Sequence, residues 1–96
     1  MNNWHSEHTN ELCEALLALR TEEECYAFLE DLCTVKEVLE LSQRLSVAKK
    51  LRSGESYSAI GAATGASSAT ISRVRRSLEY GSGGYDTVLD RLGGTT

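Results

Sequence analysis

The chain has 96 residues, a formal net charge of −4 and no proline, which suits a single small folded domain over residues 1–96. Hydrophobic residues make up 41% of the sequence and charged residues 25%, a composition typical of globular proteins that argues against a disordered chain. No apolar run approaches the roughly 18 residues that a membrane span requires, and the polar N-terminal segment has no signal-peptide core. We therefore expect a cytoplasmic protein without membrane contact.

The first half of the chain predicts three helices. Apolar residues recur at helical spacing in three segments, which span Thr9 or Asn10 to Arg20, 22–32 and 35–52. The sequences TEEE at Thr21 and TVKE at Thr34 each predict a capping box at the start of a helix. The third helix carries apolar residues on several sides, so we expect it to be buried on several sides, in part by a second subunit.

Glycine, serine and aspartate residues mark the ends of three further short helices. The boundaries lie at Gly54 after the third helix, Ser56 and Gly65 around the fourth, Ser67 before the fifth and Asp86 before the last. The fifth helix then covers about residues 68–80 and the last about 85–92, with the flexible break GSGG at 81–84 between them. Alternation of period two is absent, so the predicted fold class is all-α with about six helices.

The fourth and fifth helices have the layout of a helix-turn-helix over residues 56–80. Gly65 permits the left-handed turn between the two helices, and Gly61 is a small residue where two helices can approach each other. Ile71 and Val74 follow the turn glycine by six and nine residues, the spacing that locks the second helix onto the first.

The outward face of the fifth helix is small at its start and cationic further along. At roughly 100° per residue, small, hydroxylated and basic side chains fall opposite Ile71 and Val74. Such a face suits a major groove, because small residues let the backbone approach the bases while hydroxyls and arginines bind base edges or phosphates. The predicted DNA-contacting residues of this helix are Ser67, Ser68, Ala69, Thr70, Ser72, Arg73 and Arg76. A solvated basic face is the alternative interpretation.

Charge is unevenly distributed along the chain. Residues 1–40 hold two basic and ten acidic side chains, a net charge of −8, whereas residues 41–80 hold seven basic and two acidic side chains, a net charge of +5. The basic segment coincides with the predicted helix-turn-helix and indicates a phosphate-binding face. We expect Lys49, Lys50 and Arg52 to contact phosphates. The acidic first part either points away from DNA or is the working surface of a protein-interaction module.

The cysteines and histidines do not indicate a metal site or an enzyme. The sequence has three cysteines, Cys13, Cys25 and Cys33, and neither their odd number nor their spacing indicates a disulfide framework. We therefore expect free cysteines that behave as small hydrophobic side chains. A metal site that combined them with His5 and His8 is the alternative, but no CxxC or HExxH spacing supports it. The sequence has no nucleophile–base pair, phosphate-binding glycine loop or paired carboxylates that would predict catalysis, and no cofactor is expected.

Two segments, SGESYSAIGAATGASSATISRVRRSL and GYDTVLDRL, carry a resemblance to a known family. Over about residues 12–92 the chain resembles the Trp-repressor-like family, most closely its YerC/YecD branch. The resemblance implies an intertwined all-helical homodimer, with dimerisation helices over residues 1–53, whose two helix-turn-helix units enter successive major grooves of double-stranded DNA. It also implies a transcriptional regulator. It does not identify the operator or the target genes, and it does not distinguish repression from activation.

The resemblance also implies positions for a tryptophan site. In tryptophan-binding members two arginines flank the indole and a serine helps to hold the amino group, and the matching residues here are Arg44, Arg73 and Ser77. A glycine follows the second arginine in those proteins and makes room for the ligand, whereas Val74 stands there in this chain. We therefore expect a regulator that needs no tryptophan corepressor. A tryptophan-responsive repressor is the alternative, and a different small-molecule effector stays open.

Overall fold

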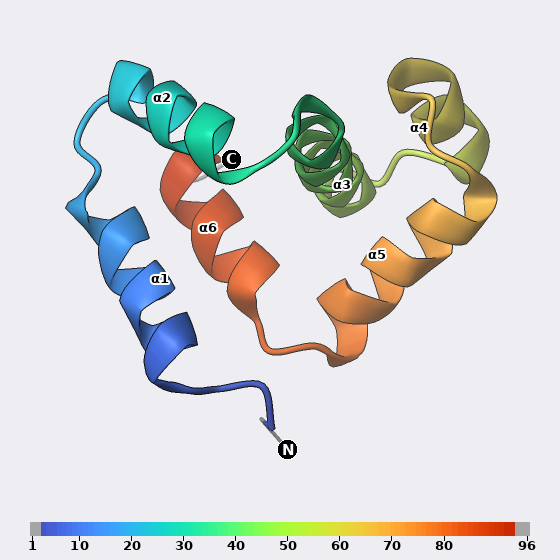
Figure 1. Ribbon diagram of the computed structural model, residues 1–96. Helices are drawn as coiled ribbons and strands as arrows, with labels where there is room; N and C mark the ends of the chain where they lie inside the picture. The colour runs from blue at the N-terminus through green and yellow to red at the C-terminus, as the bar shows by residue number, and fades with distance from the viewer. Residues whose placement is uncertain (1–2, 94–96) are drawn as a thin grey trace. The chain divides into compact units, whose positions relative to one another are not determined.

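The computed structural model describes residues 3–93, and that part of the chain consists of six α-helices without strands (Figure 1). The helices are α1 (Glu7–Ala18), α2 (Glu22–Leu32), α3 (Val35–Arg52), α4 (Tyr57–Thr64), α5 (Ser68–Tyr80) and α6 (Gly84–Gly93). The predicted all-α class and the predicted ranges of α2 to α5 are confirmed. Two units make up the chain, one up to Val38 and one from Leu39 onward. Over residues 3–93 no helix is both long enough and apolar enough to span a bilayer.

The first helix starts earlier than predicted because of a cap that the sequence pattern missed. Ser6 precedes α1, and its hydroxyl accepts the Thr9 N–H at 3.2 Å while the Thr9 hydroxyl accepts the Ser6 N–H at 2.7 Å. This reciprocal capping box uses threonine in place of the usual glutamate or glutamine. The helix therefore begins at Glu7 and ends at Ala18, before the predicted end at Arg20.

The last helix also starts earlier than predicted. It begins at Gly84, so Asp86 lies in its first turn and does not cap it. The N–H of Thr87 donates to the carbonyl of Gly83 at 3.1 Å, which closes the first helical turn without an aspartate side chain. The break after α5 is accordingly only residues 81–83, and the predicted range of 85–92 for the last helix was too short.

The capping box predicted at Thr34 is present, whereas at Thr21 only the threonine half of the predicted box is present. Thr34 and Glu37 cap each other reciprocally at the start of α3, at 3.1 Å and 2.8 Å. At the start of α2, the Thr21 hydroxyl accepts the Glu24 N–H at 3.1 Å, but the Glu24 carboxylate accepts the N–H of Arg20, one residue ahead of the cap. Each threonine accepts a backbone N–H group that the first helical turn leaves without a partner.

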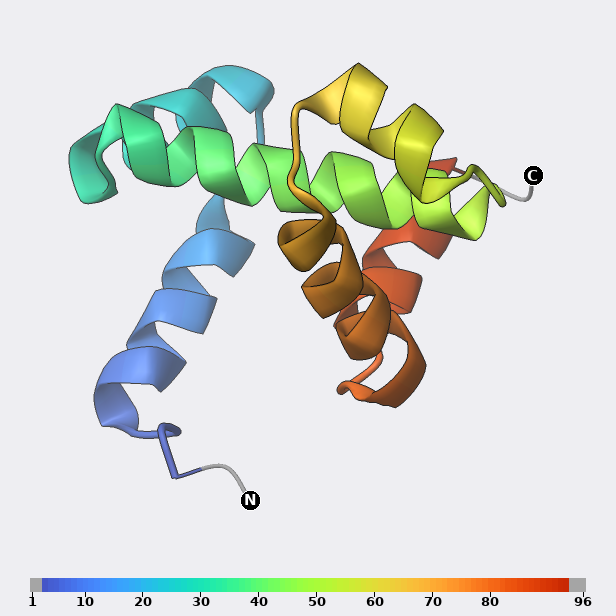
Figure 2. The ribbon, with the colours of Figure 1, turned by 90° about the vertical axis from the view of Figure 1, so that its right-hand side faces the viewer.

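The unit from Leu39 onward has a small apolar core. Figures 1 and 2 show α4, α5 and α6 arranged around α3. Each of these helices, and the turn between α4 and α5, contributes to the core, whose buried residues are Val47, Ala48, Ile60, Ala66, Ile71, Val74 and Leu89. Leu51, Tyr57, Leu78 and Tyr85 pack against this cluster and are partly buried. This core holds the helix-turn-helix on α3.

Large apolar side chains remain exposed in the single chain. Those of α3 and α6 that are exposed are Val35, Leu39, Leu41, Leu45, Val88 and Leu92. Val35 is 74% exposed and Leu39 is 63% exposed, on a helix for which the sequence pattern predicted burial in part by a second subunit. Large apolar side chains that are exposed are a feature of protein-contact regions, and the homodimer stays a prediction.

Candidate nucleic-acid interface

The turn between α4 and α5 is held by hydrogen bonds to its backbone. Gly65 ends α4 in the left-handed conformation, with φ 75° and ψ 4°, as predicted. The Thr64 hydroxyl donates to the carbonyl of Ile60 at 2.7 Å and accepts the N–H of Ala66 at 3.1 Å. From α3, the side-chain amide of Gln43 donates to the carbonyl of Thr64 at 3.1 Å. These bonds fix the start of α5 relative to α3, and no hydrophobic or capping pattern in the sequence pointed to Gln43.

Gly61 does not require glycine. A Cβ atom added at this position would meet the carbonyl oxygen of Ala66 at 3.5 Å, which is ordinary van der Waals contact. The sequence predicted a small residue at this position, and the space next to the backbone of Ala66 also admits alanine.

The start of α5 presents its short polar side chains near the turn. Ser67 caps the helix, because its hydroxyl accepts the N–H of Thr70 at 3.1 Å. Ser67, Ser68 and Ala69 are exposed and Thr70 is half-buried. The exposed side chains at this end of α5 are thus small, and DNA contact by them stays a prediction.

The two faces of α5 are oriented as the sequence predicts. Ile71 and Val74 are each 1% exposed and belong to the core. Ser72, Arg73 and Arg76 are exposed. Ser72, Arg73 and Arg76 therefore lie on the side of α5 away from its buried residues, whereas the half-buried Thr70 borders the buried side.

The three arginines of α5 differ in their partners. Nε of Arg75 lies 3.0 Å from Oε2 of Glu79, one turn further along the helix. Arg73 and Arg76 form no ion pair with any side chain in residues 3–93. Their positive charges are consequently uncompensated within the part of the chain that the structure describes.

The basic residues at the end of α3 are largely paired with carboxylates. Nη2 of Arg52 lies 2.6 Å from Oδ1 of Asp90, and Nη1 lies 3.6 Å from Oδ1 of Asp86. The hydrogen bond to Asp90 raises the pKa of Arg52, against the opposing effect of desolvation. Lys50 pairs with Glu55 at 3.8 Å. Phosphate contact by Lys50 and Arg52 stays a prediction, and it would require these pairs to rearrange or to share their cation.

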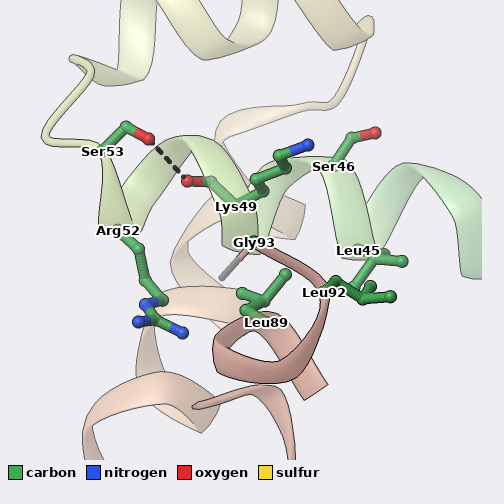
Figure 3. A pocket seen from close by; sticks show the side chains of 8 residues that line it. All are labelled: Leu45, Ser46, Lys49, Arg52, Ser53, Leu89, Leu92 and Gly93. Atoms are coloured by element: carbon green, nitrogen blue, oxygen red, sulfur yellow. Dashed lines mark hydrogen bonds between the residues drawn. The ribbon is translucent and has the colours of Figure 1, made fainter. Parts of the chain in front are cut away.

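An open groove separates the end of α3 from α6 (Figure 3). Its volume is about 510 Å³, and Leu45, Leu89 and Leu92 form its apolar side. Lys49 and Arg52 line the same groove. Lys49 forms no ion pair within residues 3–93. Of the three basic residues of α3 that are predicted to contact phosphates, it is therefore the one whose charge is unpaired in that part of the chain.

The residues that match the tryptophan site differ in burial, and one of them lines a hollow. Arg44 is half-buried, while Arg73 and Ser77 are exposed. Ser77 lines an open hollow of about 550 Å³, which Tyr85 and Val88 also line. Val74, which matches the glycine of tryptophan-binding members, is 1% exposed and packs within the core. Its inward orientation is the one predicted from the sequence.

The histidines and cysteines of the N-terminal region lie on or beside α1 and α2. Nδ1 of His8 lies 3.8 Å from Oε1 of Glu11. Cys13, Cys25 and Cys33 are free thiols. Among residues 3–93, histidine, cysteine and acidic side chains form no group of three that could hold a metal ion.

Known proteins resemble this chain in sequence and in structure. The family model described as Trp repressor protein matches residues 7–93. The uncharacterized protein YerC of Bacillus subtilis (strain 168) is 51% identical over 83 residues, which are 86% of this chain and 80% of YerC.

Two crystal structures match nearly the whole chain, each with a TM-score of 0.94. A TrpR-like protein from Eubacterium eligens ATCC 27750 is 49% identical, and the match covers 100% of this chain and 99% of that protein. A candidate Trp repressor from Staphylococcus aureus is 47% identical, and the match covers 99% of this chain and 95% of that protein. Given the family match over residues 7–93 and these similarities, the chain belongs to the Trp repressor protein family.

Proposed function

We propose that the protein is a sequence-specific DNA-binding transcriptional regulator that acts as a homodimer and needs no tryptophan corepressor. Its family and fold are those of helix-turn-helix DNA-binding regulators. The observation that carries the proposal is the outward face of α5. There Arg73 and Arg76 are exposed and unpaired within residues 3–93, just beyond a run of small side chains at the helix start. Helices that enter the major groove place such residues against base edges and phosphates.

The exposed apolar side chains support the homodimer. Val35 and Leu39 on α3, and Leu92 on α6, are 74%, 63% and 70% exposed in the single chain. Burial of such side chains contributes about 1.5–3 kcal/mol each, so a second copy that covered them would stabilise a fold whose own core is small. A dimer would also place two helix-turn-helix units on one duplex, with half-sites about one helical turn apart.

The packing of Val74 supports a regulator that is active without tryptophan. Because Val74 fills space in the core, α5 has an internal contact where tryptophan-binding members have the space beside a glycine. DNA binding should be present without tryptophan and should not change when tryptophan is added. Calorimetric titration with L-tryptophan tests this point. A saturable signal at micromolar concentrations, together with tighter DNA binding, would favour the tryptophan-responsive repressor.

The decisive experiment measures duplex binding as a function of salt. Duplexes would be selected from a random-sequence library with the purified protein, and the affinity for one selected duplex would be measured at several salt concentrations. If the dimer neutralises about 6–10 phosphates, the affinity should fall by about 10³ to 10⁵ between about 50 and 200 mM salt. Absence of duplex binding at every salt concentration would contradict the proposal and favour a protein-interaction module that uses the acidic N-terminal region.

A further inference from the structure

One arginine joins the last turn of α3 to α6. Nη2 of Arg52 donates to Oδ1 of Asp90 at 2.6 Å, and Nη1 donates to the backbone carbonyl of Asp86 at 3.4 Å. Nη1 also lies 3.6 Å from Oδ1 of Asp86. Asp86 and Asp90 are four residues apart, so their side chains lie on the same face of α6. The side chain of Arg52, which Figure 3 shows reaching from α3 toward α6, therefore contacts two successive turns of that helix.

The core anchors α6 through few side chains. Over Gly84–Gly93, Leu89 is the buried residue, and Tyr85 is partly buried against the core. The helix has 10 residues, and an isolated helix of that length is marginal in water. We therefore expect α6 to unwind whenever it leaves α3, and the contacts of Arg52 oppose that step.

The place of α6 also decides which exposed apolar side chains form one surface. Val88 and Leu92 of α6 are exposed, as is Leu45 of α3. Leu45 lines the groove together with Leu92, and it lines the hollow beside Ser77 together with Val88. These apolar side chains of two helices adjoin one another only while α6 stays on α3. They belong to the exposed apolar surface that a second subunit would cover.

We infer that Arg52 is a positioning residue, which holds α6 on α3 through Asp86 and Asp90 and so keeps the apolar surface for a second subunit in place. The inference rests on the homodimer of the proposed function, and it takes Arg52 out of the set of expected phosphate contacts. A phosphate would have to compete with two carboxylates for this guanidinium. Lys49 lines the same groove and forms no ion pair within residues 3–93, so it is the matched cation for comparison.

The size of the effect follows from the equilibrium between attached and detached α6. Exposed ion pairs change such an equilibrium by a factor of about two to five. Amide hydrogen exchange reports this equilibrium directly, because local opening exposes the N–H groups of the helix to solvent. Each subunit of a dimer must hold its own α6, so the dissociation constant of the dimer should rise by at most the square of that factor, about 25-fold.

The test compares Arg52→Gln with Lys49→Gln by hydrogen exchange, by sedimentation equilibrium and by duplex binding over a range of salt concentrations. We expect Arg52→Gln to speed exchange of the α6 amides by about two- to fivefold and to weaken the dimer. The slope of log affinity against log salt should stay that of the unmodified protein, because no phosphate contact is lost. Lys49→Gln should change neither the exchange of α6 nor the dimer. Asp90→Asn should resemble Arg52→Gln, and the two changes combined should have less than additive effects.

Three results would overturn the inference. The first is a smaller salt slope for Arg52→Gln with unchanged exchange of α6 and an unchanged dimer, as expected of a phosphate contact. The second is tighter duplex binding by Asp90→Asn, as expected if Asp90 merely competes with phosphate for Arg52. The third is equal acceleration of exchange by Lys49→Gln, which would indicate a general effect of charge. If the unmodified protein binds no duplex, the proposed DNA binding fails, whereas exchange and sedimentation still test Arg52. A monomer at every concentration would contradict its role in assembly.

Discussion

The two glycines of the helix-turn-helix should respond to alanine in opposite directions. Gly65 has φ 75°, and the nearest atom to an added Cβ is Nε2 of Gln43 at 4.0 Å. Space is therefore available, and the cost of alanine comes from the left-handed backbone, which disfavours residues with a Cβ by about 1–2 kcal/mol. Gly65→Ala should lower the free energy of unfolding by about that amount.

Gly61 lies within α4, where the backbone is right-handed. Its added Cβ would lie 3.5 Å from the carbonyl oxygen of Ala66, an ordinary contact. Alanine is favoured over glycine in a helix by about 0.8–1.0 kcal/mol. Gly61→Ala should therefore raise the free energy of unfolding by up to about 1 kcal/mol, and the two variants should differ by about 2–3 kcal/mol.

Urea unfolding followed by circular dichroism measures both changes. All samples must have the same protein concentration, because the apparent stability of a dimer depends on it. Equal m-values for the variants would show that the difference lies in stability and not in the denatured state. A loss of stability for Gly61→Ala as large as that for Gly65→Ala would refute the reasoning, since it would mean that Gly61 is needed for a close approach that the structure does not contain.

Three further predictions concern the core, the DNA contacts and the assembly. Val74→Ala removes two methyl groups from a side chain that is 1% exposed and should cost about 2–3 kcal/mol in urea unfolding, whereas the exposed Ser72→Ala should change stability by less than about 0.5 kcal/mol. On a panel of single-base operator variants, Arg73→Ala should cost about 1–3 kcal/mol and relax discrimination at one base pair, while Arg76→Ala should weaken all duplexes alike. Equal and uniform losses from both arginine variants would contradict this division. Sedimentation equilibrium at micromolar concentration should give a homodimer, and a stable species of 10.5 kDa would contradict the role proposed for the exposed apolar residues.

Much of the secondary structure could be predicted because its determinants are local. Thr34 caps a helix through a residue three positions away, and Gly65 ends one through its own backbone conformation. Local signals failed at the two outer helices, where Ser6 and Thr9 form a box without glutamate and where Asp86 sits inside α6. These errors concern a few residues at helix ends, because the hydrophobic periodicity that identifies a helix does not locate its first turn.

The inward and outward sides of α5 were also determined by the sequence. Helical geometry fixes the angle between any two side chains of one helix. Ile71 and Val74 therefore identified the buried side of α5, and their positions predicted that Arg73 and Arg76 are exposed. No knowledge of the neighbouring helices was needed for that conclusion.

Only the tertiary structure decided which basic residues are free and what holds the turn. Arg52 pairs with Asp90, 38 residues away, and Gln43 reaches the carbonyl of Thr64, 21 residues away. Composition predicted a uniform basic segment, whereas the fold distinguishes Arg52, which pairs with Asp90 on α6, from Lys49, which forms no ion pair within residues 3–93. The physical reason is that the interaction between two charges depends on their distance in space, and distance in space between separate helices is set by how the helices pack.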